Sequence, residues 1–142
     1  MTIDDIRADF ALLDDWEDRY RYVIELGRAL PPFPEELRTP ANKVLGCASQ
    51  VWLATKHIKN SGDPKSDRMT MQGTSDAHIV QGLIAVLFAI YDGKTLDEIV
   101  RADAEGIFSD LGLREHLTQQ RSNGLASMVK RIRADAELML AA

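Results

Sequence analysis

The chain reads Ser-Asp-Ala-His-Ile-Val-Gln-Gly-Leu-Ile-Ala-Val-Leu-Phe-Ala-Ile-Tyr over residues 75–91, and residues 83–91 are its longest apolar run. Apolar side chains recur here at the spacing of one helix face, at Ile79, Val80, Leu83, Ile84, Leu87 and Ile90. Val86 and Phe88 widen that face, so we predict a helix that the rest of the fold encloses almost completely. The apolar run has about half of the roughly 18 residues that a membrane-spanning helix needs.

Two shorter helices are predicted before this segment. Their apolar positions repeat at helical spacing, first at Ile3, Ile6, Phe10 and Leu13 and then at Trp16, Tyr20, Val23, Ile24 and Leu30. Asp14 or Asp15 is a suitable cap for the second helix. Prolines then exclude further helix, at positions Pro31, Pro32, Pro34 and Pro40.

Residues 42–75 have the character of strands. β-branched, aromatic and alternating residues predict three short antiparallel strands, at Val44–Leu45, Val51–Ile58 and Arg68–Gln72. The turn-forming residues 60–64 join the second and third strands, and residues 46–49 lie between the first and second. The only cysteine, Cys47, is therefore expected at or near a hairpin tip.

Helices return after the strands. Gly93 suits the C-terminal cap of the central helix, and Thr95 with Glu98 forms a capping box for the next one. Thr118 can cap a long final helix, whose buried stripe is predicted at Leu125, Met128, Val129, Ile132, Ala136 and Met139. This order of elements predicts one α+β domain over residues 1–142, with a small three-stranded antiparallel sheet packed against helices.

Charge and cysteine content exclude several classes of function. The chain has 142 residues, 17 Lys and Arg against 22 Asp and Glu, and a net charge of -5. That sign disfavours binding to nucleic acid or to an anionic membrane, and a basic protein partner suits it better. One cysteine cannot form an internal disulfide or supply the ligands of a structural zinc or iron-sulfur site. The acidic start, Met-Thr-Ile-Asp-Asp, does not resemble a signal peptide, so we expect a cytoplasmic protein.

Common catalytic motifs are missing from the sequence. His57, His78 and His116 have no metal-ligand spacing, and we expect each to be structural or to face solvent. The sequence contains neither a glycine-rich phosphate loop nor a Gly-x-Ser-x-Gly elbow. Hydrolase and nucleotide-enzyme functions therefore lose their main support.

Cys47 is the remaining candidate for chemistry. Gly46 and the small residues Ala48 and Ser49 flank it, and this context presents the thiol on a short loop. A lone cysteine can equally be an inert, buried apolar residue, and the residues alone leave both interpretations open. At a reference pKa of about 8.5, roughly 3% of such a thiol is thiolate at pH 7. Lys43 is the only cation close in sequence, so a reactive Cys47 requires help from distant residues or from a partner.

Three blocks of sequence resemble the SufE family of sulfur acceptors for cysteine desulfurases. Residues 46–52, Gly-Cys-Ala-Ser-Gln-Val-Trp, are similar to the family's Gly-Cys-x-Ser-x-Val-Trp signature. Residues 75–83 are similar to its Ser-Asp-x-x-Ile-Val-x-Gly-Leu block, and residues 116–125 to its third block. The resemblance spans nearly the whole chain; Thr74 and Gln119 depart from it, where an acid and a proline are common.

The resemblance implies a SufE/IscU-like fold and a role in iron-sulfur cluster assembly. Cys47 would take persulfide sulfur from a desulfurase of the SufS or CsdA type and pass it towards a downstream scaffold. The chain would need no cofactor, because the pyridoxal phosphate belongs to the desulfurase. A single thiol is sufficient for this transfer, and a second one could attack the Cys47 persulfide and release its sulfur as sulfide.

The same resemblance singles out further residues around Cys47. They are Gly46, Ser49, Gln50, Asp76 and Arg121, expected to support the loop or bind the partner. Gly46 is the expected hinge between a sheltered and an extended loop. Asp76 is favoured as a helix cap, a role for which Ser75 competes. Arg121 either forms a salt bridge that holds the last helix or supports the loop.

Other functions remain as alternatives. The main one is a non-catalytic adaptor that activates a desulfurase while Cys47 is incidental. A cluster scaffold would use several cysteines, and a cysteine hydrolase or peroxidase would need a base or a resolving thiol that the sequence does not place.

Overall fold

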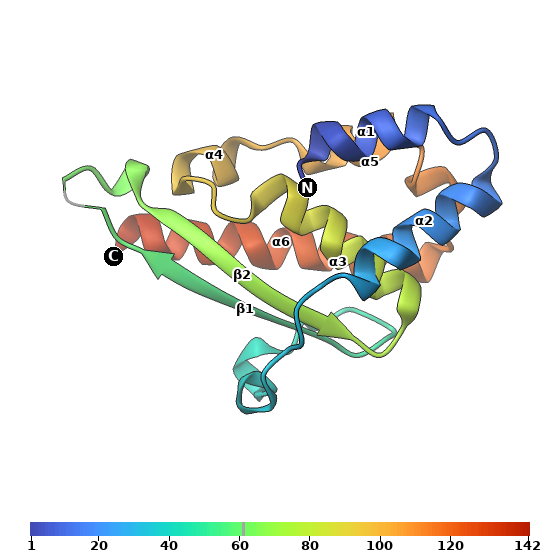
Figure 1. The fold of residues 1–142 in the computed structure, drawn as a ribbon. Helices are drawn as coiled ribbons and strands as arrows, with labels where there is room; N and C mark the ends of the chain where they lie inside the picture. Colours follow the sequence, from blue (N-terminus) through green and yellow to red (C-terminus); the bar gives the residue numbers. More distant parts are fainter. Residues whose placement is uncertain (61) are drawn as a thin grey trace.

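Helix α3 (His78–Tyr91) is the central element of the fold. The computed structural model, which describes residues 1–60 and 62–142, buries α3 among α2, β2, α1 and α6 (Figure 1). Two glycines bring the backbones of α2 and α3 into contact. A Cβ atom on Gly82 would lie 2.2 Å from the carbonyl oxygen of Val23, and one on Gly27 would lie 2.6 Å from the amide nitrogen of Gly82. The expected enclosed helix is therefore confirmed.

The remaining helices and strands surround α3. They are α1 (Ile3–Ala11), α2 (Trp16–Arg28), β1 (Val51–Ile58), β2 (Arg68–Ser75), α4 (Leu96–Arg101), α5 (Ala104–Asp110) and α6 (Gln119–Ala141). Short 3-10 turns occur at Glu35–Leu37, Pro40–Asn42, Pro64–Ser66 and Arg114–His116. Asp15, Thr95 and Thr118 cap α2, α4 and α6 as expected, each accepting a backbone hydrogen bond from the first turn. None of the helices in the described residues is long and apolar enough to cross a bilayer.

The sheet has two strands where we expected three. β1 and β2 pair antiparallel in an unbroken register from Val51 opposite Ser75 to Ile58 opposite Arg68. The expected first strand, Val44–Leu45, is absent. An isolated bridge pairs the preceding residue, Lys43, with Trp52, and the chain turns away at Gly46, where φ is +89°. Of the predicted turn at 60–64, Ser61 lies outside the described residues.

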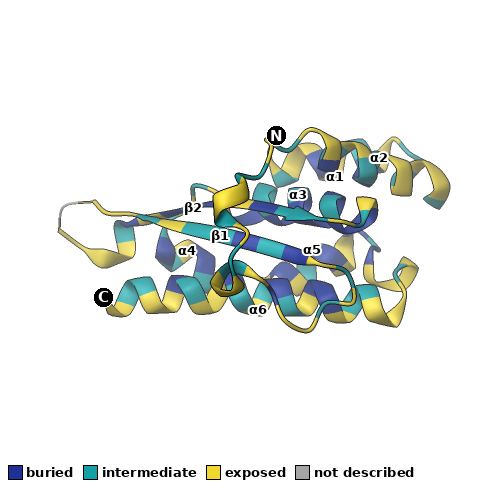
Figure 2. Ribbon diagram, turned by 90° about the horizontal axis from the view of Figure 1, so that it is seen from below, coloured by how far each residue is buried: buried dark blue, intermediate teal, exposed yellow. Residues whose placement is uncertain are grey.

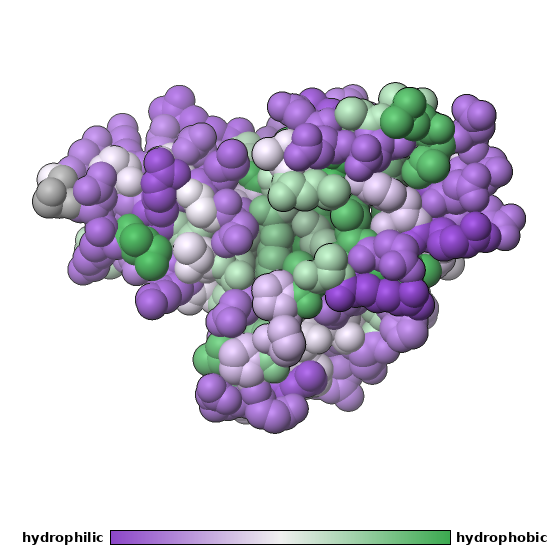
Figure 3. Space-filling model, viewed as in Figure 1, coloured by the Kyte–Doolittle hydropathy of each residue, from purple (hydrophilic) through white to green (hydrophobic). Residues whose placement is uncertain are grey.

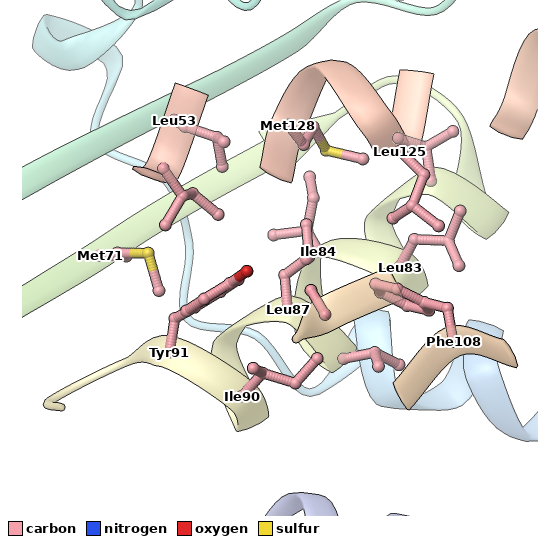
Figure 4. Packing of buried hydrophobic residues seen from close by; sticks show 14 of the residues in the cluster. Leu53, Met71, Leu83, Ile84, Leu87, Ile90, Tyr91, Phe108, Leu125 and Met128 are labelled. Carbon is pink, nitrogen blue, oxygen red and sulfur yellow. The ribbon is translucent and has the colours of Figure 1, made fainter. Parts of the chain in front are cut away.

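Apolar side chains from both strands and from the helices form one core. Figure 4 shows Leu53 and Met71 of the sheet facing Ile84 and Leu87 of α3, with Met128 of α6 beside them. Figure 2 shows that burial is concentrated on α3, on the strands and on the inner side of α6, whereas the outer sides of α1 and α6 are exposed. The α+β class is thus confirmed, and α3 contacts both β2 and α2.

Candidate functional site

The Cys47 loop lies between Val44 and the start of β1. The amide of Val44 donates to the carbonyl of Val51 over 2.9 Å, which holds the two ends of the loop together. Gly46 is required here for two reasons. Its φ of +89° favours glycine, and a Cβ atom at this position would lie 2.6 Å from Oγ of Ser127 on α6. The residue before the thiol is therefore pressed against the last helix.

The thiol of Cys47 faces an apolar niche between α3 and α6. Its side chain is half-buried, and four apolar residues line the niche, namely Val80, Leu83, Leu125 and Met128. A Cβ atom on Gly124 would lie 3.5 Å from Sγ, at ordinary van der Waals distance, so the sulfur packs directly against α6. The thiol donates a weak hydrogen bond to the carbonyl oxygen of Gly124 over 3.6 Å.

This environment makes the thiol a poor nucleophile in the observed position. Burial raises the pKa of the Cys47 thiol above its ordinary value, because the apolar niche disfavours the thiolate. The reactive form of a cysteine is the thiolate, so burial in the niche lowers the reactivity of the thiol at neutral pH. The structure therefore shows a sheltered thiol.

Arg121 holds the loop from α6. Its guanidinium donates to the hydroxyl oxygen of Ser49, two residues beyond Cys47, and its side chain also lines the niche. Of the two roles considered for Arg121, the described residues contain the contact to the loop and no ion pair of this side chain. Thr118 caps α6, and its hydroxyl accepts from the amide of Arg121, which fixes the position of Arg121 in the first turn of the helix.

Asp76 holds the other end of the loop. Its Oδ1 accepts from the amide of Gln50 over 3.0 Å, and its own amide donates to the carbonyl of Gln50 over 3.3 Å. The predicted capping role of Asp76 was wrong. The N-cap of α3 is Ala77, which has no side-chain acceptor, and Ser75 lies before the cap. Asp76 is thus free to fasten the loop because the helix begins later than the sequence suggested.

The chain matches the family model described as "SufE: Fe-S metabolism associated domain" over residues 4–136. It belongs to the SufE family. An uncharacterized SufE-like protein of Rhizobium etli is 60% identical over 141 residues, which cover 99% of this chain and 93% of the relative. One of Rhizobium meliloti is 57% identical over 136 residues, covering 96% and 95%.

The fold has a distant counterpart among solved structures. The solution structure of a hypothetical protein from Thermus thermophilus superposes with a TM-score of 0.74 at 18% identity and covers 100% of both chains. At that identity the likeness shows the fold alone. The family resemblance inferred from the three sequence blocks is therefore confirmed by the family model and by the two close relatives.

The SufE blocks that are far apart in sequence meet in the structure. Gly46, Ser49 and Gln50 belong to the loop, Asp76 precedes α3, and Arg121 opens α6. The sequence did not lead us to expect site residues on α6 beyond Arg121. Gly124 and Met128 line the niche, and Ser127 touches Gly46. A signal was present, because positions 121, 124 and 128 fall on one helix face.

The histidines take no part in this site. Nε2 of His57 lies 2.7 Å from the buried carboxylate of Asp67, and His116 stacks on Trp16 with 3.7 Å between ring centroids. His78 is exposed at the start of α3. Within residues 1–60 and 62–142, no three His, Cys, Asp or Glu side chains come together as metal ligands would.

Proposed function

We propose that Cys47 accepts sulfur from the persulfide of a cysteine desulfurase and passes it on for iron-sulfur cluster assembly. The observation that carries this proposal is the placement of the chain's single thiol. It lies on a loop that a few contacts fasten over an apolar niche, within the signature of the SufE family. A loop of this kind can both shelter the sulfur and present it.

The transfer is an exchange at sulfur. The Cys47 thiolate attacks the outer sulfur of the partner's persulfide, a new S–S bond forms at Cys47, and the old S–S bond breaks. The partner's thiolate leaves with the electron pair of the broken bond, so no net oxidation or reduction occurs. Cys47 then carries a persulfide that a later acceptor can attack in the same way.

Loop opening supplies the reactive thiol. In the niche the raised pKa keeps Cys47 neutral, whereas an opened loop exposes the sulfur to water and lets the thiolate form. Gly46 is the hinge, since its positive φ and its contact with Ser127 define the closed position. Opening breaks the contacts of Arg121 with Ser49 and of Asp76 with Gln50.

The partner supplies the cofactor and much of the docking surface. Pyridoxal phosphate would belong to a desulfurase of the SufS or CsdA type, and a downstream scaffold would receive the sulfur. Leu45 is 81% exposed two residues before Cys47, although it is a large apolar residue. An apolar side chain at this place suits a contact that the desulfurase buries when the loop opens.

An adaptor that activates a desulfurase without accepting sulfur is the second candidate. The shelter and raised pKa of Cys47 favour it, since both leave the thiol unreactive in the observed position. Under this alternative a Cys47→Ser protein would still accelerate the turnover of L-cysteine.

Intact-mass measurement separates the two. The protein is incubated with a SufS-type desulfurase and L-cysteine, and we expect it to gain one sulfur atom. Cys47→Ser is expected to gain none, and so is Cys47→Ser combined with Ser109→Cys, which moves the only thiol to an exposed position on α5. Equal loading of the relocated thiol would contradict a specific role for the Cys47 loop.

A further inference from the structure

The outer edge of β2 has a gap in its backbone hydrogen bonding. The carbonyl of Val51 accepts from Val44, so the backbone groups of Val51 point away from β2. Val51 lies opposite Ser75 in the antiparallel register, so Ser75 and the other odd-numbered residues of β2 point their backbone groups away from β1, towards the outer edge. At one end of the edge, the amide of Met69 donates to Lys94 over 3.1 Å and its carbonyl accepts from Gly93 over 2.9 Å. Backbone hydrogen bonds within the protein therefore satisfy this end of the edge.

Side chains occupy the next positions along this edge. Oδ1 of Asp92 accepts from the amide of Met71 over 2.9 Å, and Oε1 of Gln81 accepts from the amide of Ser75 over 2.7 Å. Between them, the carbonyl of Met71 and both backbone groups of Gly73 have no hydrogen-bond partner in the described part of the chain. Gly73 is buried, and buried backbone groups without a partner are rare.

An apolar groove runs beside the gap. A hollow of about 380 Å³ opens between β2, α3 and the end of α2, lined among others by Leu26, Leu30, Ala85, Phe88 and Ala89. A second hollow of about 280 Å³ lies beside Ser75 and Gln81, and Leu30 and Pro31 border both. Figure 3 shows the apolar hollow in the middle of this face.

None of the described segments of the protein fills the gap. Gly73 must lack a side chain, because a Cβ atom there would lie 2.7 Å from Cδ2 of Leu53 and 3.1 Å from Phe88. The segment after α2 borders the groove, but Pro31 and Pro32 have no N–H to offer the free carbonyls. The edge therefore stays open in the middle although it is blocked at both ends.

We propose that this edge binds an extended peptide segment of a partner protein as an added strand. One residue of an extended chain bonds to both backbone groups of Gly73, and its side chain points towards α3, into the hollow. Residues two positions away share that face, so the segment alternates apolar with polar residues. On the outward face the neighbours of Gly73 along β2 are the uncharged polar residues Gln72 and Thr74, which suit polar residues of the added strand.

This groove is separate from the sulfur-transfer site. The groove is lined by the N-terminal residues Met1 and Ile6, by α2 and the segment after it, by β2, and by the part of α3 that carries Ala85, Phe88 and Ala89. The Cys47 niche instead uses Val80 and Leu83 of α3 together with α6. The two hollows share no lining residue with that niche. A peptide could therefore occupy the groove while Cys47 exchanges sulfur.

Nuclear magnetic resonance with a designed peptide tests the proposal. The ¹⁵N-labelled full chain is titrated with acetyl-Val-Lys-Leu-Thr-Val-amide, and we expect saturable shifts and slower hydrogen exchange at the amide of Gly73. The same peptide methylated on the leucine nitrogen loses the donor to the Gly73 carbonyl, so we expect binding about tenfold weaker. Ala89→Phe fills the hollow and should abolish binding, while Ala134→Phe on the exposed face of α6 should not.

Three results would overturn the added strand. They are equal affinity for the two peptides, no shift at Gly73 at millimolar peptide, and unchanged binding by a folded Ala89→Phe protein. None of these measurements involves Cys47 or a desulfurase, so their outcome is independent of the sulfur-transfer proposal.

Discussion

The contact between Arg121 and Ser49 is expected to hold the Cys47 loop closed. Ser49→Ala removes the hydroxyl that accepts from the guanidinium and leaves the contact between Asp76 and Gln50 in place. A hydrogen bond from a charged donor contributes about 1.5–3 kcal/mol, and the low end applies because this pair is only partly buried. About 1.4 kcal/mol corresponds to a tenfold change in the closing equilibrium. The open loop should therefore be populated about tenfold more in the variant.

Alkylation of the thiol by iodoacetamide, followed by intact mass, measures this population. Only the open thiolate reacts, and closure stabilises the neutral thiol, which is why burial raises the pKa of Cys47. At a pH below the apparent pKa, Ser49→Ala should react about tenfold faster than the wild type. As the pH rises through that pKa, the thiolate itself drives the loop open and the two rates should converge. The apparent pKa of the variant should accordingly be lower.

A matched control separates loop opening from general destabilisation. Ser109→Ala removes an exposed hydroxyl on α5, far from the loop in sequence, and its alkylation rate should equal that of the wild type. Equal rates for Ser49→Ala and the wild type at every pH would contradict a loop held closed by this contact. A variant that reacted faster by the same factor above and below the apparent pKa would contradict it as well.

Three further substitutions, one of them with a matched control, test other parts of the structure. Gly46→Ala, strained at a φ of +89° and pressed against Ser127, should push the loop outwards and speed alkylation without a large change in melting temperature. Leu45→Asp should weaken stimulation of the desulfurase while leaving the melting temperature and the alkylation rate of the free protein unchanged, as stopped-flow and calorimetry can show. Gly82→Ala forces a methyl group into the α2 backbone and should lower the free energy of unfolding, measured by urea titration, by about 3 kcal/mol. Its control, Gly93→Ala, has open space around the new methyl group and should lower the free energy of unfolding by about 1 kcal/mol.

Most of the helices could be predicted because local rules decide them. The apolar periodicity of residues 79–90 and the caps at Asp15, Thr95 and Thr118 act within one or two turns of the chain. The third strand failed because strand pairing also depends on where the chain goes next. Lys43 forms a bridge with Trp52 and Val44 bonds to Val51, but Gly46 turns the backbone away before a longer strand can form.

The site shows the same division between local and distant effects. Cys47 and the loop around it could be identified from a contiguous signature. The role of Asp76 could not, because a carboxylate just before an apolar run has the pattern of a helix cap, and its true partner, Gln50, lies 26 positions away. Arg121 reaches Ser49 across 72 positions, a contact that depends on how α6 packs against α3.

Movement of sulfur onto Cys47 is tested most directly by a single-turnover transfer. A SufS-type desulfurase is loaded with ³⁵S persulfide from labelled L-cysteine, freed of excess substrate and mixed with this protein. We expect the label to leave the desulfurase and to appear on the protein in a form that reductant releases, and we expect Cys47→Ser to receive none. Label that stays on the desulfurase, while the protein still accelerates cysteine turnover, would contradict sulfur transfer to Cys47 and establish the adaptor instead.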